Sequence, residues 1–279
     1  MLKSEIKKVL PKRHPGTHKG DYGRVLIVAG SKGMLGAGVL AARAALRAGA
    51  GVVYWAVPDD LVNLANTITP EIIVIQHKQI TEIKVDVVAI GPGLGTSEQT
   101  KKLLSLVVSL PAGKAGRQSL VVIDADALNV IAKHPQLLPK DKNKDKNILT
   151  PHPGEMSRLL GQSVASIQAD RPAAAKLAAA KFNAIVVLKG DKTVVANPQG
   201  KVYLNNTGNP GMGTAGSGDV LTGLIAGLLG QVPSAYEAAQ IGVYLHGLAG
   251  DLAAKEKGEV SLIASDLVDY VPAAVLRNS

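Results

Sequence analysis

Short runs of β-branched and aliphatic residues alternate along this chain with longer, alanine-rich stretches. The short runs predict strands at 24–29, 51–57, 71–76, 85–90, 119–124, 184–189, 192–197 and 201–205. The longer stretches predict helices at about 34–49, 96–109, 163–181, 218–230, 234–255 and 264–276. This alternation is typical of a mostly parallel sheet with helices on both faces. The last two strands, separated by "PQG", predict an antiparallel hairpin at the edge of the sheet.

The composition sets the kind of core and the class of protein. Hydrophobic residues make up 46% of the 279 residues and aromatic residues only 3%, which predicts an aliphatic core. We find no internal repeat and no linker long enough to divide the chain, and we expect one domain over residues 1–279. The lack of cysteine excludes thiolate metal sites and thiol catalysis. With no visible secretory signal or membrane-spanning run, we expect a cytoplasmic protein with no membrane partner.

The formal net charge of +9 raises the question of nucleic-acid binding. A single Trp and a single Phe offer few stacking surfaces for bases, and no helix-turn-helix or RNA-binding signature accompanies the charge. Segment 139–147 is expected to be a solvated loop of mixed charge. We therefore expect no nucleic-acid partner and favour a positive field that attracts small molecules carrying polyphosphate.

Glycine-rich or polar segments follow four of the expected strands and the short run "NIL" at 147–149. In an open α/β sheet, ligands bind beyond the carboxyl ends of the strands. We therefore expect these loops to meet at one rim, together with the start of the helix near Asp219. The five segments are "GSKGMLGAG" (30–38), "GPGLG" (91–95), "DADAL" (124–128), "TPHPGE" (150–155) and "KGDKT" (189–193).

The stretch "GMGTAGSGDVLTG" at 211–223 places one acid, Asp219, at the expected start of a helix. Small residues leave backbone N–H groups bare, and the helix N-terminus adds partial positive charge, which together predict a phosphate site. A carboxylate beside phosphate indicates a base that takes a proton from a hydroxyl attacking phosphorus. The alternative is that Asp219 merely caps the helix. The flanking glycines favour catalysis.

The segment that begins at Lys189 has two readings. A lysine and bare backbone near a strand end suit nucleotide phosphates, but a plain hairpin turn with a surface lysine explains the same residues. The segment is not a phosphate-binding loop of the GxxxxGK[ST] type. We see no spacing that indicates a tight metal site and expect any Mg²⁺ to arrive with the nucleotide.

Two further loops carry candidate polar residues. His152 lies between two prolines at a strand end and is expected to hydrogen-bond a substrate amide or phosphate. Helix capping explains Pro153 and Glu155 without any function. Asp124 and Asp126 are candidates to assist a metal, although Asp126 as a helix N-cap fits equally well.

Taken in order, these motifs resemble the ADP-dependent NAD(P)H-hydrate dehydratase family. The resemblance runs from about His18 to the last helix. It implies a ribokinase-like, three-layer α/β/α fold with a mostly parallel central sheet and an antiparallel edge hairpin. The motifs are "HKGDYGRVLIVAGS", "AIGPGLG", "VVIDADAL", "LTPHPGE", "VVLKGDKT" and "NNTGNPGMGTAGSGDVLTGLIAGLL".

The resemblance implies a repair enzyme for nicotinamide nucleotides. Its substrate would be the S epimer of NADH-hydrate or NADPH-hydrate, and ADP would be the co-substrate, with Mg²⁺, giving AMP and phosphate. Asp219 would deprotonate the ring hydroxyl, which attacks the β-phosphorus of ADP before the ester eliminates. The resemblance also implies a homotetramer. Many relatives carry a fused epimerase domain, for which this chain is too short, so we expect a separate epimerase to act on the R epimer.

The family's binding residues carry over one by one to this sequence. Ala215 and Ser217 stand at variable places of the family pattern, and because both are small we expect no loss. The Mg²⁺ ligands stay open, with Glu155 as one candidate. The resemblance implies that the hydrate contacts Ala37, Gly93, His152 and Asp219, and that AMP contacts Lys189, Gly190, Asp191, Lys192, Thr193 and Gly218.

Other functions remain to be weighed. A kinase of the same fold, acting on a hydroxymethyl pyrimidine, a thiazole alcohol or a sugar, would use the same Asp219. Segments 91–95 and 150–155 favour the dehydratase over that kinase. A catalytically silent nucleotide-binding protein would need a damaged base or anion loop, and both are intact. The residues distinguish neither NADH-hydrate from NADPH-hydrate nor ADP from ATP.

Overall fold

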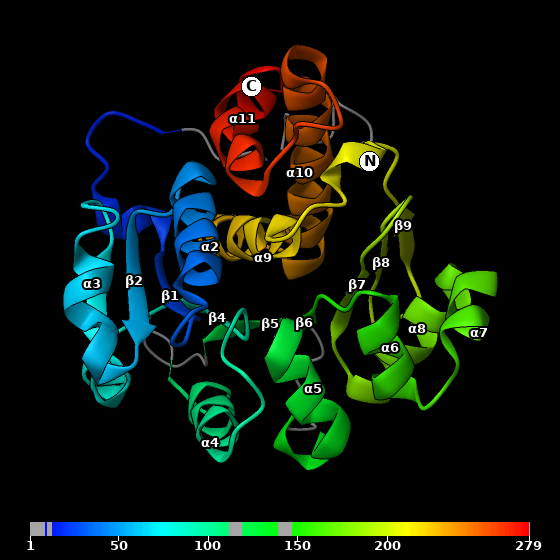
Figure 1. The fold of residues 1–279 in the computed structure, drawn as a ribbon, viewed down its shortest axis with the longest axis horizontal. Coiled ribbons are helices and arrows are strands. Elements are labelled where there is room, and N and C mark those ends of the chain that lie inside the picture. Colours follow the sequence, from blue (N-terminus) through cyan, green and yellow to red (C-terminus); the bar gives the residue numbers. More distant parts are fainter. Residues whose placement is uncertain (1–8, 10–12, 112–118, 139–146, 279) are drawn as a thin grey trace.

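A mixed sheet forms the centre of the protein (Figure 1). The structure is a computed structural model that describes residues 9, 13–111, 119–138 and 147–278. Most of the solvated loop expected at 139–147 therefore lies outside the described residues. The strands are β1 (Arg24–Val28), β2 (Val52–Val57), β3 (Ile73–Gln76), β4 (Val87–Ile90), β5 (Leu120–Ile123), β6 (Asn147–Leu149), β7 (Ile185–Leu188), β8 (Val194–Ala196) and β9 (Val202–Leu204).

The sheet has nine strands in the order β3-β2-β1-β4-β5-β6-β7-β8-β9. Neighbours from β3 to β7 pair in parallel, as in Val28 opposite Ile90. The β7–β8 and β8–β9 pairs are antiparallel. The expected edge hairpin is therefore confirmed. The strand order reverses between β1 and β4, which is the point where open α/β sheets bind ligands.

Helices cover both faces of the sheet and form the outer two layers of the fold (Figure 1). On one face α2 (Leu35–Arg47), α9 (Ser217–Leu229), α10 (Ala235–Lys257) and α11 (Ala264–Leu276) pack together. On the other face lie α4 (Glu98–Val107), α5 (Ala125–Lys133), α6 (Pro153–Leu160), α7 (Val164–Ala169) and α8 (Arg171–Phe182). The short helix α3 (Val62–Asn66) packs beside β3.

Alternation along the strands divides the core into two clusters. Val25 and Ile27 of β1 point to one helical layer, whereas Leu26 and Val28 point to the other. Successive side chains of a strand face opposite sides of the sheet, and both sides are covered here. This is why the strands appear in the sequence as continuous aliphatic runs.

The helix expected over 163–181 is two helices, which corrects the sequence-based expectation. The chain breaks at Asp170, whose carboxylate accepts a hydrogen bond from the Ala173 N–H at 2.9 Å and caps α8. Pro172 has no N–H to continue the α7 hydrogen-bond ladder, and it suits the first turn of a new helix. The expected strands omit β6 and the expected helices omit α3, α5 and α6, although the sequence pointed to a strand end before His152 and to helix starts near Asp126 and Pro153.

The loops beyond the strands meet at one rim, as expected. The Gly30 N–H donates to the carbonyl oxygen of Pro92 at 2.8 Å, and Ser31 Oγ donates to the carbonyl oxygen of Gly93 at 2.8 Å. Gly91, with φ 131°, allows its backbone to approach the carbonyl of Asp124 at a distance that any side chain would block. Among the helices that the structure describes, none is long and apolar enough to cross a membrane.

Candidate active site

Helix α9 begins at the rim with an N-terminus that no side chain of the described residues caps. Gly216 occupies the N-cap position with φ 89°, a left-handed conformation that favours glycine. The first backbone N–H groups of a helix have no intrahelical partner and attract anions. Asp219 lies in this first turn and not at the cap. The capping alternative for Asp219 is therefore wrong, while the expected anion site has the geometry it needs.

Three charged side chains form a buried cluster beneath that N-terminus, defined here as Asp124, Glu155 and Lys189. Lys189 Nζ lies 2.6 Å from Asp124 Oδ1 and 3.8 Å from Glu155 Oε2. Asp124 is only 1% exposed, and its Oδ2 accepts a hydrogen bond from Thr222 Oγ1 of α9 at 2.7 Å. Burial opposes the charge of Lys189, but the Asp124 and Glu155 carboxylates outweigh it and raise the Lys189 pKa. Lys189 therefore neutralises buried carboxylates as well as facing the rim.

The carboxyl group of Asp219 titrates near neutrality. Burial is the largest cause, the negative charge of Asp124 is the second, and together they raise the pKa of Asp219 to about 7. Lys189 lowers that pKa and so limits the shift. Within the described ranges Asp219 accepts no hydrogen bond. A general base works best when its pKa lies near the working pH and it is free to accept a proton, and Asp219 meets both conditions.

His152 is fixed at the start of α6 by a reciprocal capping arrangement. Its Nδ1 accepts a hydrogen bond from the Gly154 N–H at 2.9 Å, and its own N–H donates to Glu155 Oε2 at 2.8 Å. Because Nδ1 is an acceptor, the ring proton lies on Nε2, which is 3.4 Å from Glu155 Oε1. Partial burial and the charge of Lys189 lower the pKa of His152. The ring is thus neutral, rigid and half exposed, as a hydrogen-bonding group for a ligand requires.

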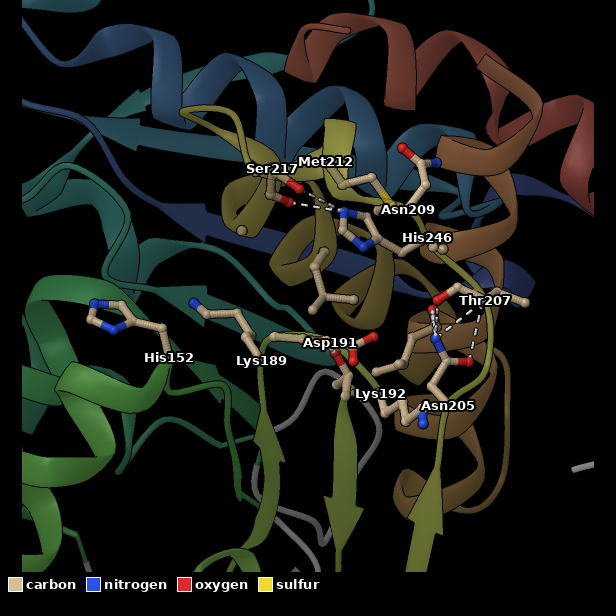
Figure 2. A pocket seen from close by; sticks show the side chains of 18 of the residues that line it. His152, Lys189, Asp191, Lys192, Asn205, Thr207, Asn209, Met212, Ser217 and His246 are labelled. Carbon is tan, nitrogen blue, oxygen red and sulfur yellow. Dashed lines mark hydrogen bonds between the residues drawn. The ribbon is translucent and has the colours of Figure 1, made fainter. Parts of the chain in front are cut away.

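A pocket of about 670 Å³ opens next to the α9 N-terminus (Figure 2). All of the residues expected to contact AMP line this pocket, together with His152. Ala37, Gly93 and Asp219 are not part of its lining. The pocket is lined by His152, Pro153, Lys189, Gly190, Asp191, Lys192, Thr193, Asn205, Thr207, Gly208, Asn209, Pro210, Met212, Gly213, Thr214, Ser217, Gly218, Leu221, Val243, His246 and Gly247.

Ala37 and Gly93 meet each other at the switch point of the sheet. A Cβ built on Gly93 would lie 3.2 Å from Ala37 Cβ and 3.0 Å from the carbonyl oxygen of Met34. Gly216, at the start of α9, packs directly against Leu40 of α2. The first turn of α9, which carries Asp219, therefore contacts α2, the helix of Ala37, and its Ser217 and Gly218 line the pocket.

Backbone strain and one arginine shape the turn after β7. Gly190 has φ 135° and Lys192 has φ 49°, so the turn uses left-handed conformations twice. Arg171 Nη2 donates to the carbonyl oxygens of Leu188 at 3.1 Å and Lys189 at 3.2 Å. The pocket wall at Gly190–Thr193 is consequently tied to the start of α8. No motif in the sequence indicated a role for Arg171.

Polar residues of segment 205–209 form the opposite wall and bind α10. Thr207 Oγ1 donates to the carbonyl oxygen of Tyr244 at 2.9 Å, and Asn209 Nδ2 donates to Asp251 Oδ1 at 3.1 Å. Gly247 admits this approach, because a Cβ there would lie 2.6 Å from the carbonyl oxygen of Thr207. The "NNTGN" pattern directly before the anion loop was the available signal for this wall, but it could not reveal the partner helix.

The donor set near the pocket does not form a metal cage. Among the described residues, no group of three or more His, Asp or Glu side chains is arranged to hold a metal ion. Asp124, which the sequence offered as a metal assistant, and Glu155 instead face Lys189. Asp126 is not an N-cap but lies inside α5, where its Oδ2 accepts from the Gly95 N–H at 2.8 Å. Mg²⁺ commonly keeps several waters and binds through substrate phosphates, and this site is compatible with that mode.

The model of the NAD(P)H-hydrate dehydratase family matches residues 25–273. The chain belongs to this family. The bifunctional NAD(P)H-hydrate repair enzyme of Moorella thermoacetica is 46% identical over 287 residues, covering 96% of this chain and 52% of that protein. The chain thus spans about half the length of this curated relative.

A second relative of this chain is similar to it over most of the length of both proteins. It is the ADP-dependent (S)-NAD(P)H-hydrate dehydratase of Neisseria meningitidis, 40% identical over 97% of this chain and 90% of the relative. Among solved structures, the ADP/ATP-dependent NAD(P)H-hydrate dehydratase of Bacillus subtilis, co-crystallised with ATP/Mg²⁺, has a TM-score of 0.87 and 33% identity, covering 100% and 98% of the two chains. A ribokinase-like superfamily protein of Enterococcus faecalis has a TM-score of 0.87 and 27% identity over 100% and 95%. The ribokinase-like fold expected from the sequence is confirmed.

Proposed function

We propose that this chain restores NADH or NADPH from the S epimer of the corresponding hydrate, with ADP as phosphoryl donor. The observation that carries the proposal is the position of Asp219. Its carboxyl group, with a pKa of about 7, lies in the first turn of a helix whose N-terminus is open to an anion. Ser217 and Gly218 of this turn line the pocket, and Gly216 packs against Leu40 of α2, the helix that also carries Ala37 next to Gly93. A nucleotide and a hydroxyl-bearing ring would therefore meet at Asp219.

The first step would transfer a phosphoryl group. Asp219 takes the proton of the C6 hydroxyl, whose oxygen forms a bond to the β-phosphorus of ADP. The bond between that phosphorus and the bridging oxygen breaks, and AMP leaves with the electron pair. The open N–H groups of α9 would hold the transferred group, because they match the negative charge of its oxygens.

The second step would remove phosphate from the ring. The C6–O bond of the ester breaks, and phosphate leaves with the bonding electrons as the ring nitrogen donates its lone pair. Loss of a proton from C5 then restores the double bond of the dihydronicotinamide. The net change is hydrate plus ADP giving NAD(P)H, AMP and phosphate, so the water removed from the ring is consumed in splitting ADP.

The remaining roles follow the chemistry of the wall residues. Gly190, Asp191, Lys192, Thr193 and Gly218 would hold the AMP part, and Lys189 would orient it while neutralising Asp124. Rigid, neutral His152 would hydrogen-bond the hydrate together with Ala37 and Gly93. When bound with the nucleotide, Mg²⁺ supplies charge neutralisation at the phosphates. The Bacillus relative is named for both ADP and ATP, which makes ATP a second donor to test. A separate epimerase, a homotetramer and a cytoplasmic location stay predictions.

The test is to mix the protein with Mg²⁺, ADP and chemically hydrated NADH and to follow the dihydronicotinamide absorbance. We expect recovery that requires ADP or ATP and yields AMP (or ADP) and phosphate in equal amounts. Asp219→Asn should abolish recovery, whereas Asp269→Asn, which removes an exposed carboxylate of α11, should not. A stable phosphate ester without recovery would instead indicate a small-molecule kinase.

A further inference from the structure

His246 joins helix α10 to the first turn of α9 at the wall of the pocket. Its Nε2 lies 2.9 Å from the carbonyl oxygen of Ser217 and 3.4 Å from Ser217 Oγ. His246 itself lines the pocket, and Figure 2 shows its ring beside Ser217 with Nδ1 turned away from Ser217. The ring therefore has one nitrogen committed to the protein and one that faces the ligand space.

The contact with Ser217 determines which nitrogen carries the proton. A carbonyl oxygen only accepts hydrogen bonds, so Nε2 must carry the hydrogen. Burial, reinforced by the charge of Lys189, lowers the pKa of His246 to about 4, against the opposing effect of the Ser217 carbonyl. The ring is neutral at physiological pH, and a neutral imidazole has only one N–H. His246 Nδ1 is consequently an acceptor and not a donor.

This acceptor has no partner among the residues that the structure describes. The neighbouring polar side chains of the wall are already engaged within the protein. Asn205 Nδ2 donates to the carbonyl oxygen of Thr207, Thr207 Oγ1 donates to Tyr244, and Asn209 bonds to Asp251. His246 Nδ1 is not among the buried polar atoms without a partner in the described residues, so it is accessible from the pocket. A ligand that fills the pocket and excludes water from Nδ1 must supply a donor, because an acceptor buried without one costs free energy.

We propose that His246 Nδ1 accepts a hydrogen bond from a donor group of the bound nucleotide, either a ribose hydroxyl or the exocyclic amine of the base, while Nε2–H holds the first turn of α9 through Ser217. The inference rests on the proposed function, since it takes the pocket as the nucleotide site. It assigns His246 two separate tasks, recognition through Nδ1 and positioning of the anion site through Nε2.

The two tasks can be separated by a pair of amide substitutions. In His246→Asn the amide oxygen can occupy the place of Nδ1, so the acceptor is kept and the bond to Ser217 is lost. In His246→Gln the amide reaches the place of Nε2, so the donor to Ser217 is kept and the acceptor is lost. We expect His246→Gln to weaken ADP binding about five- to tenfold, the effect of one hydrogen bond of about 1 kcal/mol. We expect His246→Asn to lower kcat more than it raises the KM for ADP.

Nucleotide analogues identify the donor. Binding of ADP, 2′-deoxy-ADP, 3′-deoxy-ADP and purine riboside diphosphate, which lacks the 6-amino group, would be measured by calorimetry for the wild-type protein and both variants. We expect one analogue to bind the wild-type protein about five- to tenfold more weakly than ADP. His246→Gln should bind that analogue and ADP equally, whereas His246→Asn should still distinguish them. Thermal melting of each variant verifies that it is folded.

Two failures can be told apart. If the wild-type protein binds neither ADP nor ATP, the proposed function is wrong. If the wild-type protein binds all three analogues with the same affinity as ADP, none of the three donor groups contributes a hydrogen bond. The inference about His246 is then wrong, even if neither variant folds. The inference would also be overturned if a folded His246→Gln protein bound ADP as tightly as the wild-type protein and still distinguished ADP from the weaker analogue.

Discussion

Lys189 Nζ and Asp124 Oδ1, which come from residues 65 positions apart, lie 2.6 Å from each other at the rim of the sheet. The lysine that the sequence offered for a nucleotide is thus also the counter-ion of a carboxylate that is almost wholly buried. Glu155 and Asp219 add to the negative charge around it. The positive charge of Lys189 therefore compensates the negative charges of three carboxyl groups in the candidate site.

We expect Lys189→Met to destabilise the protein by about 3 kcal/mol at pH 8, since it leaves Asp124 buried without its counter-ion. The loss should shrink at pH 5, where Asp219, with a pKa of about 7, is protonated and less negative charge surrounds position 189. Urea unfolding at pH 8 and pH 5 measures both effects. The matched control is Lys192→Met in the same turn, where the lysine is exposed. Equal stability of the two variants at pH 8 would contradict the assigned role of Lys189.

The rate should depend on the charge of Asp219. A base acts only as the carboxylate, and the pKa of this group is about 7. We therefore expect kcat/KM for the hydrate to fall tenfold for each pH unit below about 7 and to level off above it. Steady-state rates between pH 5 and pH 9 give the profile. An activity that stays constant down to pH 5 would show that Asp219 isn't the titrating base.

Asp219→Asn should stabilise the protein while it abolishes activity. The pKa of Asp219 is raised by folding from 3.8 to about 7, so the folded state loses stability as the pH rises between these values. The asparagine variant escapes this loss. After allowance for solvent screening, we expect it to be about 1 to 2 kcal/mol more stable than wild type at pH 8 and equal to it near pH 4. Denaturant unfolding at the two pH values tests the sign, and lower stability of the variant at pH 8 would refute it.

Arg171 should act on nucleotide binding through the backbone of the turn after β7. Its guanidinium accounts for two hydrogen bonds to carbonyl oxygens, at Leu188 and Lys189. We expect Arg171→Gln to raise the KM for ADP several-fold, with a smaller effect on kcat, because the turn loosens while Asp219 stays in place. Lys176→Gln on the same helix removes an equal charge from an exposed site and should leave KM unchanged. Similar KM values for both variants would exclude a positioning role for Arg171.

Local signals in the sequence account for most of the fold. The aliphatic runs determined the strands, because in a sheet covered on both faces each strand must be apolar on both sides. Glycine and polar residues after those runs indicated the rim, and the small residues before Asp219 indicated the anion site. The short helix α3 was not predicted, and β6 was recognised only as a strand end before His152, because a few residues carry too little periodicity to define an element.

What the sequence by itself determined is the layered architecture and the residue types at the rim, since both depend on neighbours along the chain. Only the tertiary structure decided which of those residues meet. Thr222 contacts Asp124 across 98 positions, and His246 reaches Ser217 from another helix. The pKa of Asp219 depends on the burial and the charges that these contacts create. Folding brings distant groups into one weakly screened space, and no local pattern records that proximity.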